Sequence, residues 1–174
     1  MALTQIIGSG ISGITIPNFI TEYDIFYQTL NLGSNASSTT DLTENLQRFD
    51  GNGFEKIGTG MSLSSGIFTF PSTGKYHVLA KANMQSRDGA TTQCLFKIAV
   101  TLNNSSYTEI ARAEGGSHAA DATFTLLAST LVDVTDTSNV KVKFQISTST
   151  NAVRTLGASN IFRTGFTFIK LGNT

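Results

Sequence analysis

The stretch Gly66-Ile-Phe-Thr-Phe-Pro-Ser-Thr-Gly-Lys-Tyr-His-Val78 decides the fold class of this 174-residue chain. Apolar residues recur on both sides of a short Pro-Ser-Thr-Gly turn, which is the pattern of two β-strands joined by a tight connection. Pro71 fixes its own φ, and Gly74 tolerates a positive φ, so both residues favour a turn here. The stretch Phe162-Arg-Thr-Gly-Phe-Thr-Phe-Ile-Lys-Leu171 predicts a final aromatic strand.

Short segments of alternating apolar and polar residues, separated by turn residues, continue through the rest of the chain. In residues 140–146 the apolar side chains fall on one side and Lys141 and Lys143 on the other, which predicts one buried and one wetted face. Residues 21–30 fit either a short strand or a helix. The chain is therefore predicted to be all-β, an antiparallel sandwich of the jelly-roll type. The predicted strands are 46–49, 54–57, 67–70, 76–82, 94–102, 107–112, 122–134, 140–146 and 160–171.

The charge balance narrows the classes of partner. Lys and Arg number 12, Asp and Glu number 12, and charged residues make up only 14% of the chain. Because basic residues do not outnumber acidic ones, the chain has no net electrostatic attraction to a phosphate backbone, and we expect no nucleic-acid partner. Low net charge promotes association, which favours a protein that works in an assembly. No apolar run approaches the ~20 residues that span a bilayer, and the start lacks the basic region of a signal peptide, so we expect no membrane insertion.

The N-terminal residues differ from the rest. Isoleucines alternate there with small Gly and Ser residues, a composition that cannot build a two-sided core. We predict an extended arm and polar linker over residues 1–43, followed by a jelly-roll domain over residues 44–174. The arm is expected to lie against neighbouring chains or a foreign surface. The residues predicted to anchor it are Ile6, Ile7, Ile11, Ile14 and Ile16.

Residues that could carry chemistry are few. No Gly-x-Ser-x-Gly elbow, Walker loop, His-Glu-x-x-His or Cys-x-x-Cys occurs, so the sequence predicts no enzyme, cofactor or metal site. Cys94 lies in a strand-like segment and is interpreted as a buried free thiol. Glu114, His118 and Asp121 could surround a cation, but a polar loop tip is the simpler interpretation. His77 is interpreted as a solvated strand residue.

The two quoted stretches resemble the tumour-necrosis-factor/complement-globular-head superfamily of jelly rolls, over about residues 44 to 174. The complement-type signature has Phe, five residues, Gly, one residue and Tyr, and Phe68, Gly74 and Tyr76 match it. Its two later aromatic positions hold Val78 and Ala80 instead. The resemblance implies a homotrimer packed around a threefold axis. It also implies that four residues lie either in the core or along that axis: Tyr76, Val78, Phe166 and Phe168.

Other phrases are similar to bacteriophage virion proteins, especially those of marine and cyanobacterial phages. They are Met1-Ala-Leu-Thr, Gly53-Phe-Glu-Lys-Ile-Gly-Thr-Gly-Met61 and the closing Phe168-Ile-Lys-Leu-Gly172. This resemblance implies a place in the virion, with assembly in the host cytoplasm. The first hypothesis is a trimeric capsid decoration or cement protein whose arm binds the major capsid protein or another virion protein.

The alternative hypothesis is a receptor- or glycan-binding tip of a head or tail fibre. Three predicted loops would then contact host-surface glycans, over residues 88–92, 114–121 and 151–159. None of them holds Trp, Tyr or Phe, which argues against a sugar-stacking platform. A third hypothesis, a secreted cytokine-like ligand, lacks a signal peptide and a membrane anchor.

Overall fold

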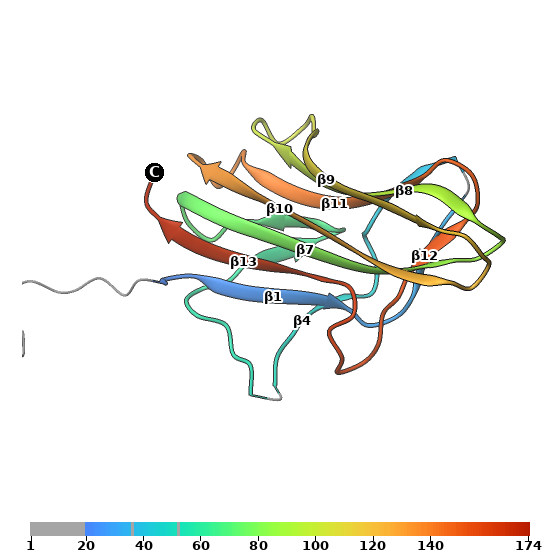
Figure 1. The fold of residues 1–174 in the computed structure, drawn as a ribbon. Helices are drawn as coiled ribbons and strands as arrows, with labels where there is room; N and C mark the ends of the chain where they lie inside the picture. Colours follow the sequence, from blue (N-terminus) through green and yellow to red (C-terminus); the bar gives the residue numbers. More distant parts are fainter. Residues whose placement is uncertain (1–19, 36, 52) are drawn as a thin grey trace, which may run out of the picture.

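The computed structural model describes residues 20–174 apart from 36 and 52, and within them it contains thirteen strands and no helix (Figure 1). The strands are β1 (Tyr23–Gln28), β2 (Leu32–Ser34), β3 (Thr39–Asp41), β4 (Leu46–Arg48), β5 (Ser62–Ser64), β6 (Ile67–Thr69), β7 (Gly74–Ser86), β8 (Thr91–Thr101), β9 (Thr108–Ser117), β10 (Thr123–Val134), β11 (Lys141–Thr148), β12 (Val153–Thr155) and β13 (Gly165–Gly172).

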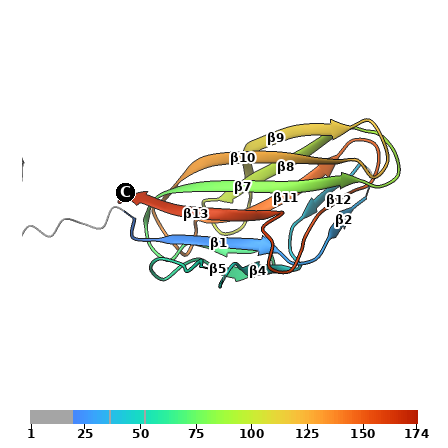
Figure 2. The same ribbon diagram turned by 60° about the horizontal axis from the view of Figure 1, so that its bottom comes forward.

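These strands form two antiparallel sheets packed face to face (Figure 2). Sheet A runs in the order β2-β12-β7-β13-β1-β4, and β10 pairs with the other edge of β7. Sheet B runs in the order β5-β6-β11-β8-β9, and β3 also pairs with β11. Strands that are distant in the chain are neighbours in both sheets, as in β1 beside β13. The architecture is therefore the predicted jelly-roll sandwich.

The core between the sheets is built largely from aromatic rings. The centroid of Phe68 lies 5.1 Å from that of Phe26, 5.6 Å from that of Phe144 and 5.5 Å from that of Phe166. Because side chains alternate across a strand, even-numbered residues of β7 and β11 point into this core and odd-numbered ones point away from it. The prediction that 140–146 has one buried face is confirmed.

The predicted turn at the start of β7 is also confirmed. Gly74 has a φ of +143°, a backbone conformation that residues other than glycine rarely adopt. Two residues later, the Tyr76 hydroxyl is buried and donates a hydrogen bond to the Ser72 carbonyl oxygen, at 3.2 Å. The turn therefore folds back over the first inward residue of β7 and satisfies its polar group.

The sandwich begins earlier in the chain than the sequence predicted. Residues 23–28 form β1 between β13 and β4, and residues 32–41 contribute β2 and β3. The boundary expected between residues 43 and 44 thus lies inside the two sheets, and β2 and β3 belong to the segment that was expected to be arm and linker. Residues 54–57, predicted as a strand, make only isolated bridges, from Gly51 to Phe54 and from Tyr23 to Ile57.

The long strands give the molecule two distinct ends (Figure 1). At the terminal end, Tyr23 at the start of β1 pairs with Ile169 near the end of β13. At the loop end, β7 connects to β8 and β9 connects to β10. The N-terminal arm therefore joins the sandwich at the end opposite to these two connections.

Candidate functional site

The four residues that the sequence placed in the core or on a threefold axis are in the core of the single chain. Tyr76, Val78 and Phe166 are 0% exposed and Phe168 is 1% exposed. Their side chains lie between the two sheets, so none of them reaches the outer surface of the molecule. The five arm isoleucines lie outside the described residues.

The outer surface of sheet A carries apolar side chains that the sequence analysis missed. Leu79 on β7 is 37% exposed, and Leu127 and Leu131 on β10 are 61% and 64% exposed. Because the core residues of both strands are even-numbered, these odd-numbered leucines all point away from the core. We call these three residues the outer leucine face. Leu126-Leu127 and Leu131-Val132 were the available signal, because one member of two adjacent apolar residues in a strand must point outward.

A groove of about 600 Å³ continues this apolar surface around the edge of the sandwich. It lies between the start of β9 and the end of β10, which belong to different sheets and do not pair with each other. Leu131 is common to the outer leucine face and the groove. The apolar residues that line the groove are Val100, Leu102, Ile110, Leu131 and Val132, and the polar ones are Asn103, Ser106, Thr108, Asp133 and Thr135.

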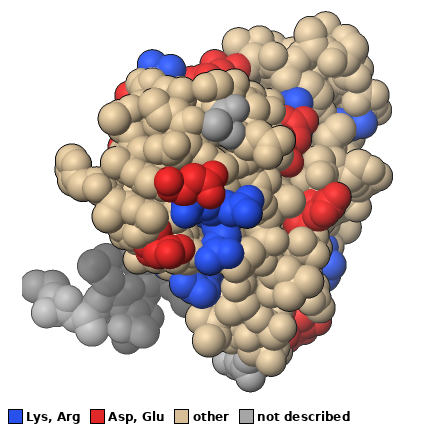
Figure 3. Space-filling view, turned by 90° about the vertical axis from the view of Figure 1, so that its right-hand side faces the viewer, with Lys and Arg blue, Asp and Glu red and all other residues tan. Residues whose placement is uncertain are grey.

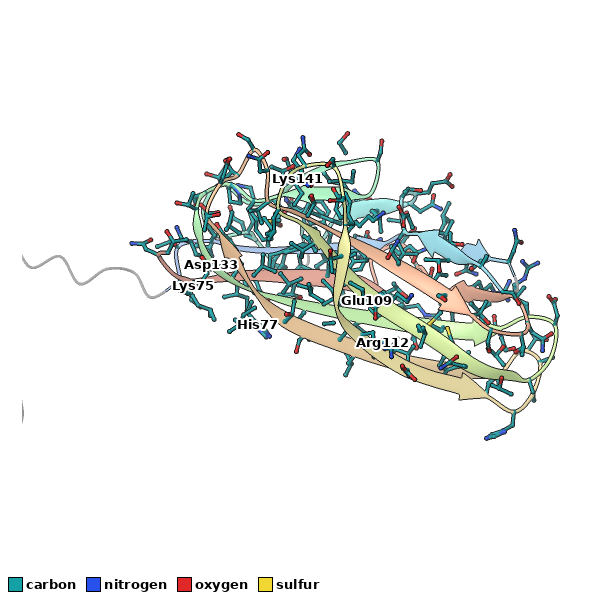
Figure 4. The ribbon with its side chains drawn as sticks, turned by 90° about the horizontal axis from the view of Figure 1, so that it is seen from above. Lys75, His77, Glu109, Arg112, Asp133 and Lys141 are labelled. Carbon is teal, nitrogen blue, oxygen red and sulfur yellow. The ribbon has the colours of Figure 1, made fainter. Side chains whose placement is uncertain are left out.

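Charged pairs border this apolar surface (Figure 4). Lys75 pairs with Asp133 at 2.9 Å, at the terminal end of β7 and β10. On β9, Glu109 and Arg112 belong to a ladder in which Lys97 pairs with Glu109 at 3.2 Å. These groups are partly exposed, so each pair contributes little to stability. Leu131 connects the outer leucine face to the groove, and Lys81 and His77 lie opposite Leu127 and Leu131 on the same side of sheet A.

The three loops of the alternative hypothesis meet at the loop end. The Asn151 side-chain amide donates to the Ala90 carbonyl oxygen at 2.5 Å, and Thr91 pairs with Ser117. A hollow of about 250 Å³ lies between two of the loops, lined by Ala90, Thr91, Thr92, Gly116, Ser117 and His118. Figure 3 looks onto this end: a small group of Lys and Arg side chains gathers beside acidic ones, and most of the surface carries no charge.

The candidate cation ligands are not gathered into a site. Among residues 20–174 other than 36 and 52, no group of three or more His, Cys, Asp or Glu side chains is placed to hold a metal ion. In the β10–β11 connection, the Asp136 carboxylate accepts hydrogen bonds from the Ser138 amide at 2.7 Å and from the Asn139 side chain at 2.6 Å. These bonds stabilise the carboxylate and lower its pKa. The same described part of the chain has no helix that could cross a membrane.

Comparison of the fold with solved structures places it among tumour-necrosis-factor-like jelly rolls. Eiger TNF from S. frugiperda superposes with a TM-score of 0.65 at 9% identity, over 87% of this chain and 93% of that one. Murine APRIL superposes with a TM-score of 0.61 at 12% identity, over 86% of this chain and 98% of that one. PRD1 vertex protein P5 superposes with a TM-score of 0.50 at 16% identity, over 88% of this chain and 99% of that one. The chain has a TNF-like fold, and these low identities carry no more than the fold. No protein-family model and no curated sequence matches the chain.

Proposed function

We propose that this chain is a non-enzymatic structural protein of a phage virion: a homotrimeric capsid decoration or cement protein. Its jelly roll forms the trimer, and its N-terminal arm binds the major capsid protein or another virion protein. The observation that carries the proposal is the outer leucine face on a TNF-like sandwich. The residues assigned to anchoring are Ile6, Ile7, Ile11, Ile14 and Ile16.

The outer leucine face supports an interface between copies. Contiguous exposed apolar surface on a globular protein marks a surface that binds something, and covering it gains roughly 25 cal/mol per Å². The chain itself is the partner with the best support, because the jelly-roll superfamily that the sequence resembles assembles as trimers. Leu79, Leu127 and Leu131 then replace the core residues as the proposed contacts between copies.

The arrangement of the two ends supports attachment through the arm. Copies related by a threefold axis point the same way, so their arms would leave from the same side of the trimer. Three weak arm contacts then act together, which raises the overall affinity without stronger single contacts. The structural similarity to a vertex protein of phage PRD1 supports a place in the virion.

One alternative is a receptor- or glycan-binding tip of a head or tail fibre. It is favoured by the convergence of three loops at the loop end, over residues 88–92, 114–121 and 151–159. Hydroxyl groups and the imidazole of His118 line the hollow there, and such groups can exchange hydrogen bonds with sugar hydroxyls. The loops hold no Trp, Tyr or Phe, so an aromatic platform for a sugar ring is missing from them.

The trimer is tested by Leu127→Asp, which places a charge on the outer leucine face. We expect the wild-type chain to sediment as a trimer and the variant to sediment as a monomer. Leu30→Asp is the matched control, because Leu30 is equally exposed, at 61%, but lies in the β1–β2 connection. Circular dichroism must show that both variants are folded. A trimeric Leu127→Asp variant would refute the proposed interface.

The anchoring role is tested with the full-length double variant Ile11→Asp/Ile14→Asp. Wild-type and variant proteins are incubated with undecorated capsids, and the bound fraction is measured after sedimentation. We expect the variant to remain trimeric and to lose capsid binding. Loss of trimers in this variant would place the arm in the oligomer instead. If the wild-type protein binds host cells or glycans and not capsids, the fibre-tip alternative holds.

A further inference from the structure

One of the two histidines of the chain, His77, lies among the residues of the outer leucine face. It is odd-numbered on β7, so its side chain points away from the core, like that of Leu79 two residues along. It pairs with Leu131 on β10 on one side and with Ile169 on β13 on the other. Side chains paired in this way lie about 5 Å apart on one face of a sheet. The imidazole therefore has apolar neighbours on three sides.

On β7, β10 and β13, the charged side chains that share this side of sheet A are two lysines and one aspartate. Lys75 is two residues before His77, and its ammonium pairs with the Asp133 carboxylate on β10 at 2.9 Å (Figure 4). Lys81 is four residues after His77 on the same strand. On β13, Lys170 is directed to the turn before β7. The one carboxylate of these three strands is thus already paired with a lysine, and none is left for a protonated imidazole.

A second copy that covers this face should favour the uncharged form of His77. A cation loses its hydration when apolar side chains cover it, and that loss is not compensated without an opposite charge. Lys75 and Lys81 add repulsion instead. In the free chain the side chain of His77 is partly exposed, and imidazole groups in water titrate between about pH 5 and 8. Protonation of His77 is therefore easier in the monomer than in the trimer.

We propose that His77 makes the trimer sensitive to pH: the copies associate through the outer leucine face with His77 uncharged, and acid separates them. The inference rests on the proposed function, because it requires that this face joins the copies. The sign follows from the protons bound. The monomer binds more of them than the trimer, so a fall in pH favours the monomer. Threefold symmetry gives each trimer three such histidines, so their effects multiply.

Sedimentation of the full-length chain over a range of concentrations, at about pH 7.5 and about pH 5.5, tests the inference. The lower value is about one unit below the ordinary pKa of imidazole and above that of carboxylates. Each histidine should then weaken the trimer about tenfold, and three together about 1000-fold. The dissociation midpoint, which is the chain concentration at which half of the chains are trimeric, should rise about 30-fold. Circular dichroism must show a folded chain at both pH values.

Variants of the two histidines identify the group that titrates. His77→Gln keeps a polar, uncharged side chain, so its dissociation midpoint should be the same at both pH values. His118→Gln is the matched control, because His118 lies in the β9–β10 connection at the loop end, and it should retain the wild-type dependence. His77→Lys is charged at both pH values and should be shifted towards monomers at both.

The outcomes separate this inference from the trimer itself. The inference is overturned if the wild-type midpoint does not change with pH, if the trimer is tighter in acid, or if His77→Gln retains the full dependence. Each of these results leaves the proposed trimer in place. A wild-type chain that is monomeric at about pH 7.5 would instead refute the proposed trimer, and this inference would fall with it.

Discussion

The ring of Phe144 lies parallel to the ring of Phe166, with 3.6 Å between their centroids and 3° between their planes. Phe144 belongs to β11 of sheet B and Phe166 to β13 of sheet A, so this stack joins the two layers. Phe68 on β6 packs edge-on against both rings. The three residues come from distant parts of the chain, and their cluster fixes how the two sheets sit on each other.

Removing the Phe144 ring should therefore cost a large fraction of the stability. Phe144 is 1% exposed, and Phe144→Ala is expected to lower the free energy of unfolding by roughly 3–5 kcal/mol. Urea denaturation measures it, with an unchanged m-value as the sign that the fold is retained. Phe162→Ala is the control, because Phe162 is only half-buried and should cost less. An equal loss in both variants would contradict the role of the stack.

The sequence predicted the long strands because their pattern is carried by buried apolar residues. Val142, Phe144 and Ile146 alternate with polar residues in β11, and all three are in the core. The early strands lack this signal. β2 and β3 are polar and only three residues long, and their segments are held by backbone pairing and by contacts such as Ser34 Oγ to Thr40 Oγ1 at 2.9 Å. Such strands look like a linker in sequence.

The candidate site was harder to predict than the fold. Aromatic and alternating residues such as Tyr76 and Phe168 stand out in sequence, but they stand out because they form the core. Each outer leucine is next to another apolar residue in the sequence, and which of the two is exposed depends on which face of its strand meets sheet B. The groove depends on two strand edges that meet only in the folded chain.

An ion pair between buried Asp24 and partly exposed Arg48 joins β1 to β4 and is expected to contribute to stability. Asp24 is 1% exposed, and it accepts hydrogen bonds from Arg48 Nε at 3.0 Å and from the Met61 amide at 2.8 Å. Arg48→Met leaves the Asp24 carboxylate without its cation and also removes the guanidinium that lies 4.9 Å from the centroid of the Phe26 ring. The expected loss is about 1.5–3 kcal/mol. The Arg48 side chain is 33% exposed, and water can replace part of the lost bonding, so the lower half of this range applies.

The pair itself is tested by a double-mutant cycle in urea. Asp24→Asn removes the charge that Arg48 neutralises, and the double variant Asp24→Asn/Arg48→Met removes both charges. If the two residues act as a pair, the double variant is more stable than the sum of the single losses implies. Strict additivity would mean that each residue contributes through other contacts.

Gly74 should be intolerant of any side chain. Its φ is +143°, and an added Cβ would meet the Gly172 carbonyl oxygen and the Lys170 side chain. Gly74→Ala is expected to lower the free energy of unfolding by more than about 1 kcal/mol. Gly172→Ala is the matched control on the neighbouring strand, because a Cβ there meets nothing within 4 Å. Its effect should stay within about 0.5 kcal/mol. Similar losses at the two positions would argue against a conformational cause.

The buried thiol of Cys94 should make stability depend on alkaline pH. Its side chain lies 3.6 Å from Met84 Sδ in an apolar environment, and burial raises its pKa from about 9 to about 12. In the folded chain the thiol stays protonated through pH 10, whereas in the unfolded chain it ionises. The unfolded state therefore binds fewer protons over this range. The free energy of unfolding must therefore fall as pH rises from the unfolded-state pKa of about 9 to the folded-state pKa of about 12. This group contributes a fall of up to about 1.4 kcal/mol per pH unit.

Cys94→Ala isolates the contribution of the thiol. Urea denaturation of both proteins from pH 8 to pH 11 should give a shallower fall for the variant, on top of a constant loss from the missing sulfur. Burial also raises the pKa of Tyr76, so part of the fall remains in the variant. In the folded wild-type protein at pH 8, iodoacetamide should modify Cys94 only when the chain transiently unfolds. In urea, where the chain is unfolded, the reaction should run at the rate of a free thiol. Parallel pH profiles, or fast modification of the folded chain, would mean that the thiol is accessible to water.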